Sequence, residues 1–329
     1  RFKNLNETYE FVVTNRHYVY RYEGGPELAE DLLKEKPYDV HCYSEDTEIL
    51  TKDRGWQTFG ELIKEDLVAQ YDKGVISFVK PLDYVWQKYE GDMIHIKNAK
   101  TDQLITPNHR VLTYNSESKK EVVKLAEDFL TLSSAFHYPT VGNLNSDVNN
   151  IDYPEEFYEL IIAIQADGHL QTDSKAITFC FTKQRKIDRL LLILNKLNIK
   201  NSISVSEREG RKETSIRLLA KQSLVLELLS WFDKDKNLVK SFLDLPLDIR
   251  ISIINSIGIW DGTVRNNKDI VLDSTNFDFV KTIQTLCSTS GFKNSYKEYT
   301  KTTTYGTVEV ARVYISVNSK NTYKTIRNC

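Results

Sequence analysis

Two aspartates, Asp167 and Asp261, stand in matching surroundings in the second half of the sequence. Each closes an apolar run, IIAIQAD (161–167) and IINSIGIWD (253–261), and each is followed by a glycine. A single acid at a helix end is ordinarily solvated and does no chemistry. A second copy at the distance of a domain favours another interpretation, because two metal ions that cleave a phosphodiester need carboxylates from two places. The pair predicts a divalent-metal site, with Mg²⁺ or Mn²⁺ as the ion.

The first half contains a second set of reactive residues. Cys42 opens the stretch CYSEDTEILT (42–51), and TPNH (106–109) interrupts a strand-like run. A thiol is a good nucleophile only as the thiolate, so a catalytic cysteine needs assistance from a neighbour. From these residues alone, Cys42 is the one thiol of a small β-domain and His109 is a loop residue.

Composition restricts the class of protein. Apolar residues make up 40% and charged residues 27% of the 329 positions, which is typical of a globular protein. No apolar run approaches the ~20 residues that span a bilayer, and the first residues do not resemble a signal peptide. Four scattered cysteines (Cys42, Cys180, Cys287 and Cys329) lack metal-binding spacing. We therefore expect a reducing, cytoplasmic location.

Charge is distributed unevenly along the chain. Residues 1–150 contain 18 Lys and Arg against 25 Asp and Glu, whereas residues 151–329 contain 26 against 21. The second half is therefore the better partner for a polyanion, although a small basic excess is also found on ordinary solvated surfaces.

The elements around the two aspartates repeat in the same order. Each aspartate ends a helix and is followed by two strands, a helix and two strands, which indicates an internal duplication. After Asp167 we predict strands over 169–174 and 176–182, a helix over 183–200, strands over 201–209 and 214–222, and a further helix at SLVLELLSWF. After Asp261 we predict strands over 261–267 and 269–275, a helix over 276–291, and strands over 292–301 and 307–317.

With these motifs, the second half resembles LAGLIDADG homing endonucleases that carry both repeats in one chain. The matching stretches are LIIAIQADG (160–168), IINSIGIWDG (253–262) and the helices that follow them, within roughly 151–329. The resemblance implies an α+β fold of two αββαββ repeats with saddle-shaped antiparallel sheets. It also implies side-by-side motif helices, metal bound by Asp167 and Asp261, and cleavage of a long double-stranded DNA site by a monomer.

Helices that pack closely need small residues at their contact. Ala163 and Ala166 meet this need in the first copy, and Ser256 and Gly258 in the second. Trp260, directly before the second acid, is larger than the family's usual residue, so we expect the helix packing to differ there.

Two lysines, Lys221 and Lys320, close the last strand of each repeat. A lysine at this place can stabilise charge on the scissile phosphate, which makes both catalytic candidates. The alternative is a solvated lysine at a strand end.

The two stretches of the first half, taken in order, resemble the first two blocks of an intein splicing domain, the Hint fold, over about 42–114. The resemblance implies that Cys42 attacks the carbonyl of His41 to form a thioester. Thr106 would hold the strained amide and His109 would donate a proton to its nitrogen. Residues 1–41 would then belong to a host protein, the extein, and 42–150 to a small all-β splicing domain. The two repeats would occupy 151–245 and 246–329.

The C-terminal residues Asn328 and Cys329 are candidates for the second half of splicing, with Arg327 in place of the usual histidine. The last strand of the second repeat uses residues 307–320, which leaves no room for closing strands of the splicing domain. The other possibility is therefore a closing segment that follows Cys329 or has been lost.

The leading hypothesis is an intein with an embedded, metal-dependent DNA endonuclease. One alternative is a DNA-binding protein without cleavage, or an RNA-binding maturase, on the same fold. Another is a self-processing domain whose endonuclease has decayed. Partners on the leading hypothesis are duplex DNA and the flanking host segments, with no membrane.

Overall fold

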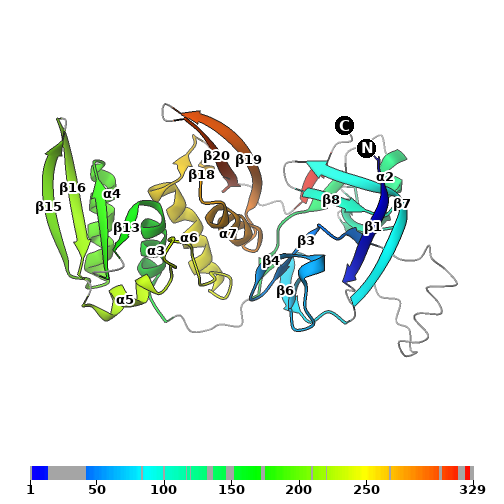
Figure 1. The fold of residues 1–329 in the computed structure, drawn as a ribbon, viewed down its shortest axis with the longest axis horizontal. Coiled ribbons are helices and arrows are strands. Elements are labelled where there is room, and N and C mark those ends of the chain that lie inside the picture. Colours follow the sequence, from blue (N-terminus) through cyan, green and yellow to red (C-terminus); the bar gives the residue numbers. More distant parts are fainter. Residues whose placement is uncertain are drawn as a thin grey trace. The chain divides into compact units, whose positions relative to one another are not determined.

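A computed structural model gives the fold (Figure 1). It describes residues 2–13, 42–82, 84–98, 101–115, 117–118, 120–131, 136–145, 152–171, 175–208, 210–219, 221–266, 268–303, 306–317 and 323–326. The chain divides into two compact units. Unit 1 is Arg1–Asn145 with Asn321–Cys329, and unit 2 is Ser146–Lys320. Among the described residues, no helix has the length and apolar character needed to cross a membrane.

Unit 1 is built from strands, with one short α-helix and one 3-10 helix among its described residues. A closed barrel has the order β1-β2-β8-β7, from β1 (Phe2–Val13), β2 (Tyr43–Ser44), β7 (Tyr84–Asn98) and β8 (Thr101–Ile105). A five-stranded sheet has the order β12-β6-β5-β3-β4, from β3 (Glu48–Thr51), β4 (Gly55–Thr58), β5 (Val68–Asp72), β6 (Val75–Val79) and β12 (Asn143–Leu144). A four-stranded sheet has the order β10-β9-β11-β21, from β9 (Arg110–Asn115), β10 (Lys120–Leu125), β11 (Phe136–Pro139) and β21 (Tyr323–Ile326). The helices are η1 (Phe59–Glu61) and α2 (Asp128–Thr131).

A compact core joins the strands that carry the Cys42 and His109 stretches. Alternate residues of β9 point inward, as the pattern of a half-buried strand requires. The core consists of Ile94, Ile96, Ile105, Val111, Ala126 and Phe129, with Tyr43 and Tyr138 packed against it.

Strand β21 changes the domain boundaries that the sequence suggested. It pairs antiparallel with β11, with Phe136 opposite Ile326 and Pro139 opposite Tyr323. Residues 321–329 therefore group with unit 1, whereas the sequence pattern predicts that they belong to the second repeat, with no room for a closing strand. The physical reason is length. The second repeat already completes its sheet at Ser316, so the residues that follow are free to pair elsewhere.

Unit 2 has the duplicated order that the sequence predicts. The first copy is α3 (Glu155–Asp167), β13 (Gly168–Gln171), β14 (Ala176–Phe181), α4 (Gln184–Lys196), β15 (Asn201–Arg208) and β16 (Arg211–Leu218). The second is α6 (Leu247–Trp260), β17 (Thr263–Val264), β18 (Ile270–Ser274), α7 (Phe277–Ser288), β19 (Lys293–Thr303) and β20 (Gly306–Ser316). Helix α5 (Ser223–Leu229) lies between the copies. The sheets have matching orders, β13-β14-β16-β15 and β17-β18-β20-β19, and are antiparallel throughout.

The strand registers define equivalent positions in the two repeats. Leu170 and Val264 each stand three residues after an aspartate, and they pair with Ile177 and Ile270. Those residues pair in turn with Leu218 and Ile315, which face Asn201 and Asn294. The strand registers of the two sheets therefore correspond position by position from the acids outward.

Helices α3 and α6, which we call the motif helices, lie side by side in the middle of unit 2 (Figure 1). Their apolar residues face neighbours on all sides, so Ile161, Ile162 and Ile254 are fully buried. Ala163 and Ser256 are buried as well.

Gly258 has a different role from the one expected at the helix contact. A methyl group on Gly258 would lie 2.7 Å from the Val264 side chain, so this glycine admits β17 of its own repeat. The glycines after the acids act in the same way. A methyl on Gly168 would lie 2.8 Å from the Ile164 backbone, and one on Gly262 would lie 2.9 Å from the carbonyl oxygen of Ile257. Each strand can therefore leave its helix at close range.

Candidate functional site

The motif helices place both predicted acids at the same end of the helix pair. Asp167 is the last residue of α3, and Asp261 caps α6 with its backbone N–H donating to the Ile257 carbonyl. The two carboxylates lie near enough that the charge of Asp167 raises the pKa of Asp261. Both acids therefore lie at the same end of the helix pair, and their role in binding metal remains a prediction.

Both like and opposite charges act on the two acids. Burial raises the pKa of Asp261 and the Asp167 charge raises it further, while Lys186 and Lys236 lower it. Asp261 is an exposed residue, although neighbouring protein groups still keep part of the water away from its carboxylate. The ammonium of Lys186 lies 2.5 Å from a carboxylate oxygen of Asp167. Two neighbouring carboxylates repel each other when both are ionised, and the two lysines partly offset this repulsion.

Lys236 is a cation of this site that the sequence analysis missed. Burial lowers its pKa, and the charges of Asp167 and Asp261 oppose that change, so its ammonium lies near both acids. Lys236 lies in the loop of residues 233–237. Asp233 holds this loop, because its carboxylate accepts hydrogen bonds from the backbone N–H groups of Asp235 and Asn237. Lys236 adopts a left-handed φ of 66° in a turn where its backbone N–H donates to the Asp233 carbonyl.

Trp260 explains how a bulky residue is accommodated between the motif helices. Its indole N–H donates to the Glu159 carboxylate on α3 over 3.2 Å. Glu159 also receives both nitrogens of the Arg189 fork, from α4. Trp260 and Glu159 are 1% and 3% exposed, so this is a buried polar network in which the charge is paired. Arg185 adds a hydrogen bond of 2.8 Å to the Ile259 carbonyl, which fixes the end of α6 directly before Asp261.

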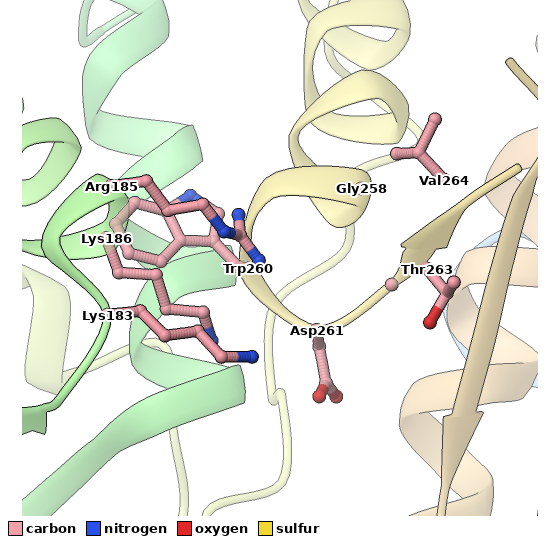
Figure 2. Close-up of a pocket in the computed structure, with 9 residues that line it drawn as sticks. Lys183, Arg185, Lys186, Gly258, Trp260, Asp261, Thr263 and Val264 are labelled. Atoms are coloured by element: carbon pink, nitrogen blue, oxygen red, sulfur yellow. The ribbon is translucent and has the colours of Figure 1, made fainter. Parts of the chain in front are cut away.

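A pocket of about 460 Å³ opens beside Asp261. Its lining combines the start of α4 with the end of α6 and β17: Lys183, Arg185, Lys186, Gly258, Trp260, Asp261, Gly262, Thr263 and Val264. In Figure 2 the carboxylate of Asp261 and the ammonium of Lys183 are turned to the same side of the pocket. Cationic groups next to a carboxylate suit a phosphate that arrives together with a cation.

The donor set fits a magnesium-type ion. Mg²⁺ is commonly bound through one or two carboxylates, with water and substrate phosphates as the remaining ligands. Asp167 and Asp261 supply such a pair. Among the residues that the structure describes, no group of three or more His, Cys, Asp or Glu side chains gathers at a metal-binding distance. The pair by itself leaves most positions around such an ion to ligands from outside the protein.

Of the other predicted catalytic residues of unit 2 and of the C-terminus, the structure describes Lys221. Lys221 is exposed in the turn before α5, and within the described residues the cations that interact with the acids are Lys186 and Lys236. Lys320, Asn328 and Cys329 fall outside the described residues. The strand registers also separate Lys221 from Lys320, since Lys221 follows Leu218 by three residues and Lys320 follows the equivalent Ile315 by five.

The structure brings Cys42 and Thr106 together in unit 1. The backbone N–H of Cys42 donates to the Thr106 hydroxyl over 3.1 Å, and the Cys42 carbonyl accepts from the Thr106 N–H over 3.1 Å. His109 follows in the same turn, where its N–H donates to the Thr106 carbonyl, and its ring lies 4.3 Å from the ring of Tyr43. All three predicted residues are buried. Thr106 thus holds the nitrogen of the peptide bond before Cys42.

Comparison with known proteins gives partial likenesses. No protein-family model matches the chain. The ribonucleoside-diphosphate reductase subunit beta of Aquifex aeolicus is 28% identical over 78% of the chain. The C-terminal section of the DNA-directed RNA polymerase subunit beta of Stigeoclonium helveticum is 33% identical over 23% of the chain, and the ATP-dependent Clp protease proteolytic subunit of Chlamydomonas moewusii is 36% identical over 22%. The chain spans 41% of the first relative and 7% of each of the other two.

Solved structures similar to the chain include LAGLIDADG proteins. The N-terminal LAGLIDADG domain of DUF199/WhiA covers 52% of the chain and 82% of its own, at 14% identity and a TM-score of 0.34. I-DmoI in complex with DNA and Mn covers 50% of the chain and 92% of its own, at 13% identity and a TM-score of 0.35. Since both TM-scores are below 0.5, the architecture of unit 2 is assigned from its own topology: a mixed α+β fold of two αββαββ repeats with paired motif helices.

Proposed function

We propose that unit 2 is a LAGLIDADG-type endonuclease that makes double-strand breaks in a long specific DNA site with Mg²⁺ or Mn²⁺. The observation that carries this proposal is the convergence of Asp167 and Asp261 from the ends of two paired helices in a duplicated fold. A duplicated site suits a duplex, because each strand of the duplex presents one phosphodiester to be cut.

The residues of the site have separate roles in this proposal. A bound divalent ion would supply Lewis-acid assistance to hydrolysis of the phosphodiester. Asp167 and Asp261 would hold that ion. Lys236 places positive charge where the phosphate gains negative charge, and Lys183 and Arg185 bind the same phosphate or its neighbour. Lys186 neutralises Asp167 until DNA and metal arrive.

The experiment is cleavage of a randomised duplex library by the full chain, with sequencing of the cut ends. We expect Mg²⁺-dependent breaks at a narrow set of related sequences, and none from the Asp167→Asn/Asp261→Asn variant. The matched control is Asp244→Asn/Asp248→Asn, which removes two acids from the segment that leads into α6 and its first turn. Binding without breaks by the wild type would support a non-cleaving DNA-binding protein, and the same result with RNA would support a maturase.

We also propose, as a second function, that unit 1 is an intein splicing domain in which Cys42 forms a thioester with the carbonyl of His41. The contact between the Cys42 N–H and the Thr106 hydroxyl supports it, because this nitrogen is the leaving group of that step. Strand β21 supports it further by leading the chain back to unit 1 directly before Asn328 and Cys329. These two residues would then complete splicing between the flanking host segments.

The relatives agree with an inserted element. Their names describe a reductase subunit, a polymerase subunit and a protease subunit, and the match covers only 7% of two of them. The chain is similar to parts of proteins whose activities are unrelated to one another. This favours a segment that is inserted into different host proteins over a piece of any one host enzyme. The prediction for Cys42 in the Discussion tests this second function.

A further inference from the structure

Each sheet of unit 2 has one face against the helices and one face turned away from them, which we call the open face. In β14 and β16 the residues Ile177, Phe179 and Ile216 are buried against the helices, while Cys180 and Arg217, which alternate with them, are exposed on the open face. In the second repeat the alternation is found in β20 from Ala311 to Ser316, whereas β18 begins with three buried residues, Ile270, Val271 and Leu272.

The registers allow the open faces to be compared position by position. Starting from the equivalent pairs Asn201–Leu218 and Asn294–Ile315, the next three pairs that the register assigns to the open face form the middle of each sheet, although one of their residues, Val310, is buried. In the first repeat these pairs are Ser202–Arg217, Ser204–Ser215 and Ser206–Glu213; in the second they are Ser295–Tyr314, Lys297–Arg312 and Tyr299–Val310. The duplication has kept the fold and changed this surface.

The middle of the second sheet forms a connected cationic and aromatic array. The guanidinium of Arg312 lies 5.0 Å from the ring centre of Tyr299, donates to its hydroxyl, and pairs with Asp273 at 2.5 Å. The ammonium of Lys297 lies 5.0 Å from the same ring. Beside the array, Arg265 stacks over Tyr314 at 5.4 Å. These contacts hold the cations in place before any partner arrives, which lowers the entropy lost on binding.

The middle of the first sheet has a different chemistry. Four of its six residues are serines, and its one arginine, Arg217, is matched by one acid, Glu213. Where the second repeat has Asp273 paired with Arg312, the first has Cys180 opposite Ser215. Short hydroxyl side chains allow close approach and can either donate to or accept from a base edge, but they add no charge.

From this difference we propose that the two repeats make different kinds of contact with duplex DNA. The middle of the second sheet, centred on Lys297, Tyr299 and Arg312, grips phosphates and supplies the salt-dependent part of the affinity. The serine-lined middle of the first sheet contacts base edges and adds little to it. This inference rests on the proposed DNA-binding function of unit 2.

The test is the salt dependence of binding to a 30-base-pair duplex of mixed sequence, without divalent metal, using the full chain. Lys297→Ser installs the residue that the first repeat has at the equivalent position, Ser204. Arg217→Ser is the matched control, because it removes one cation from the middle of the other sheet. Each phosphate contact contributes about 0.9 to the slope of log K against log salt concentration. We expect the slope to lose about 0.9 in Lys297→Ser and to keep its wild-type value in Arg217→Ser, with circular dichroism showing both variants folded.

Three results separate the possibilities. An equal loss in both variants, or a larger loss in Arg217→Ser, overturns this difference in contacts and leaves the proposed endonuclease in place. If the wild type binds the duplex weakly and with an affinity that does not depend on salt concentration, both the DNA-binding function and this inference are refuted. The expected pattern supports both.

Discussion

The indole nitrogen of Trp260 lies 3.2 Å from a carboxylate oxygen of Glu159, and this contact ties the helix that ends before Asp261 to the helix that ends at Asp167. Both side chains are buried, and Arg189 completes the network from α4. The residue that looked too large for the helix contact therefore serves as a link between the two halves of the site.

Replacing Trp260 with Phe should destabilise unit 2. The change removes a donor from a buried, charged acceptor, and a hydrogen bond to a charged group contributes about 1.5–3 kcal/mol to stability. Scanning calorimetry of the full chain should show one lowered transition. Trp56→Phe is the control, because Trp56 is 38% exposed in unit 1. An unchanged profile for Trp260→Phe would show that the Glu159 contact contributes nothing.

Asp261 should make the metal-free protein less stable as pH rises. Its pKa is raised in the folded state by burial and by Asp167, so the folded chain holds this proton at pH values where the unfolded chain has lost it. The penalty is absent below the unfolded pKa of about 3.9, grows through the raised pKa and is complete above it. Asp261→Asn should therefore raise the melting temperature at pH 7 in EDTA and have little effect at acid pH. An equal shift at both pH values would point to packing rather than charge.

Cys180 should report DNA on the open face of the first sheet. Cys180 is exposed, whereas Cys287 is buried, and burial raises the pKa of the Cys287 thiol. A thiol alkylating reagent should therefore modify Cys180 far faster than Cys287. Duplex DNA should slow modification of Cys180, as measured by mass spectrometry of its peptide. Cys180→Ser identifies the signal. A rate that DNA leaves unchanged would place the duplex away from this sheet.

Cys42 should permit cleavage of the chain by hydroxylamine. If it forms a thioester, the treated chain breaks between His41 and Cys42 and releases residues 1–41. Cys42→Ala should abolish the break, and His109→Ala should slow it by roughly 10²–10⁴, the usual contribution of a placed proton donor. Thr106→Val should slow it too, because the Cys42 nitrogen loses its hydroxyl partner. Mass spectrometry measures the fragment, and an intact wild type would reduce unit 1 to a scaffold.

The sequence predicted what repetition and periodicity encode. The positions of Asp167 and Asp261, and the order of strands and helices around them, follow from apolar runs and from the duplication. Lys236 was missed because a lysine in a charged loop has no periodic signal, and only the tertiary structure brings that loop to the acids. The pairing of β21 with β11 was missed for a similar reason: it joins segments almost two hundred residues apart, and no local pattern records such a partner.

The central claim, that Asp167 and Asp261 jointly bind a divalent ion beside DNA, is tested most directly by Mn²⁺ binding. The full chain is mixed with a duplex from the cleavage selection, and electron paramagnetic resonance measures the Mn²⁺ that stays free. The amount of bound Mn²⁺ follows by difference. We predict that the wild type binds Mn²⁺ tightly only with DNA, and that Asp167→Asn and Asp261→Asn each lose that binding while retaining the duplex. Wild-type Mn²⁺ binding in both variants would contradict the claim.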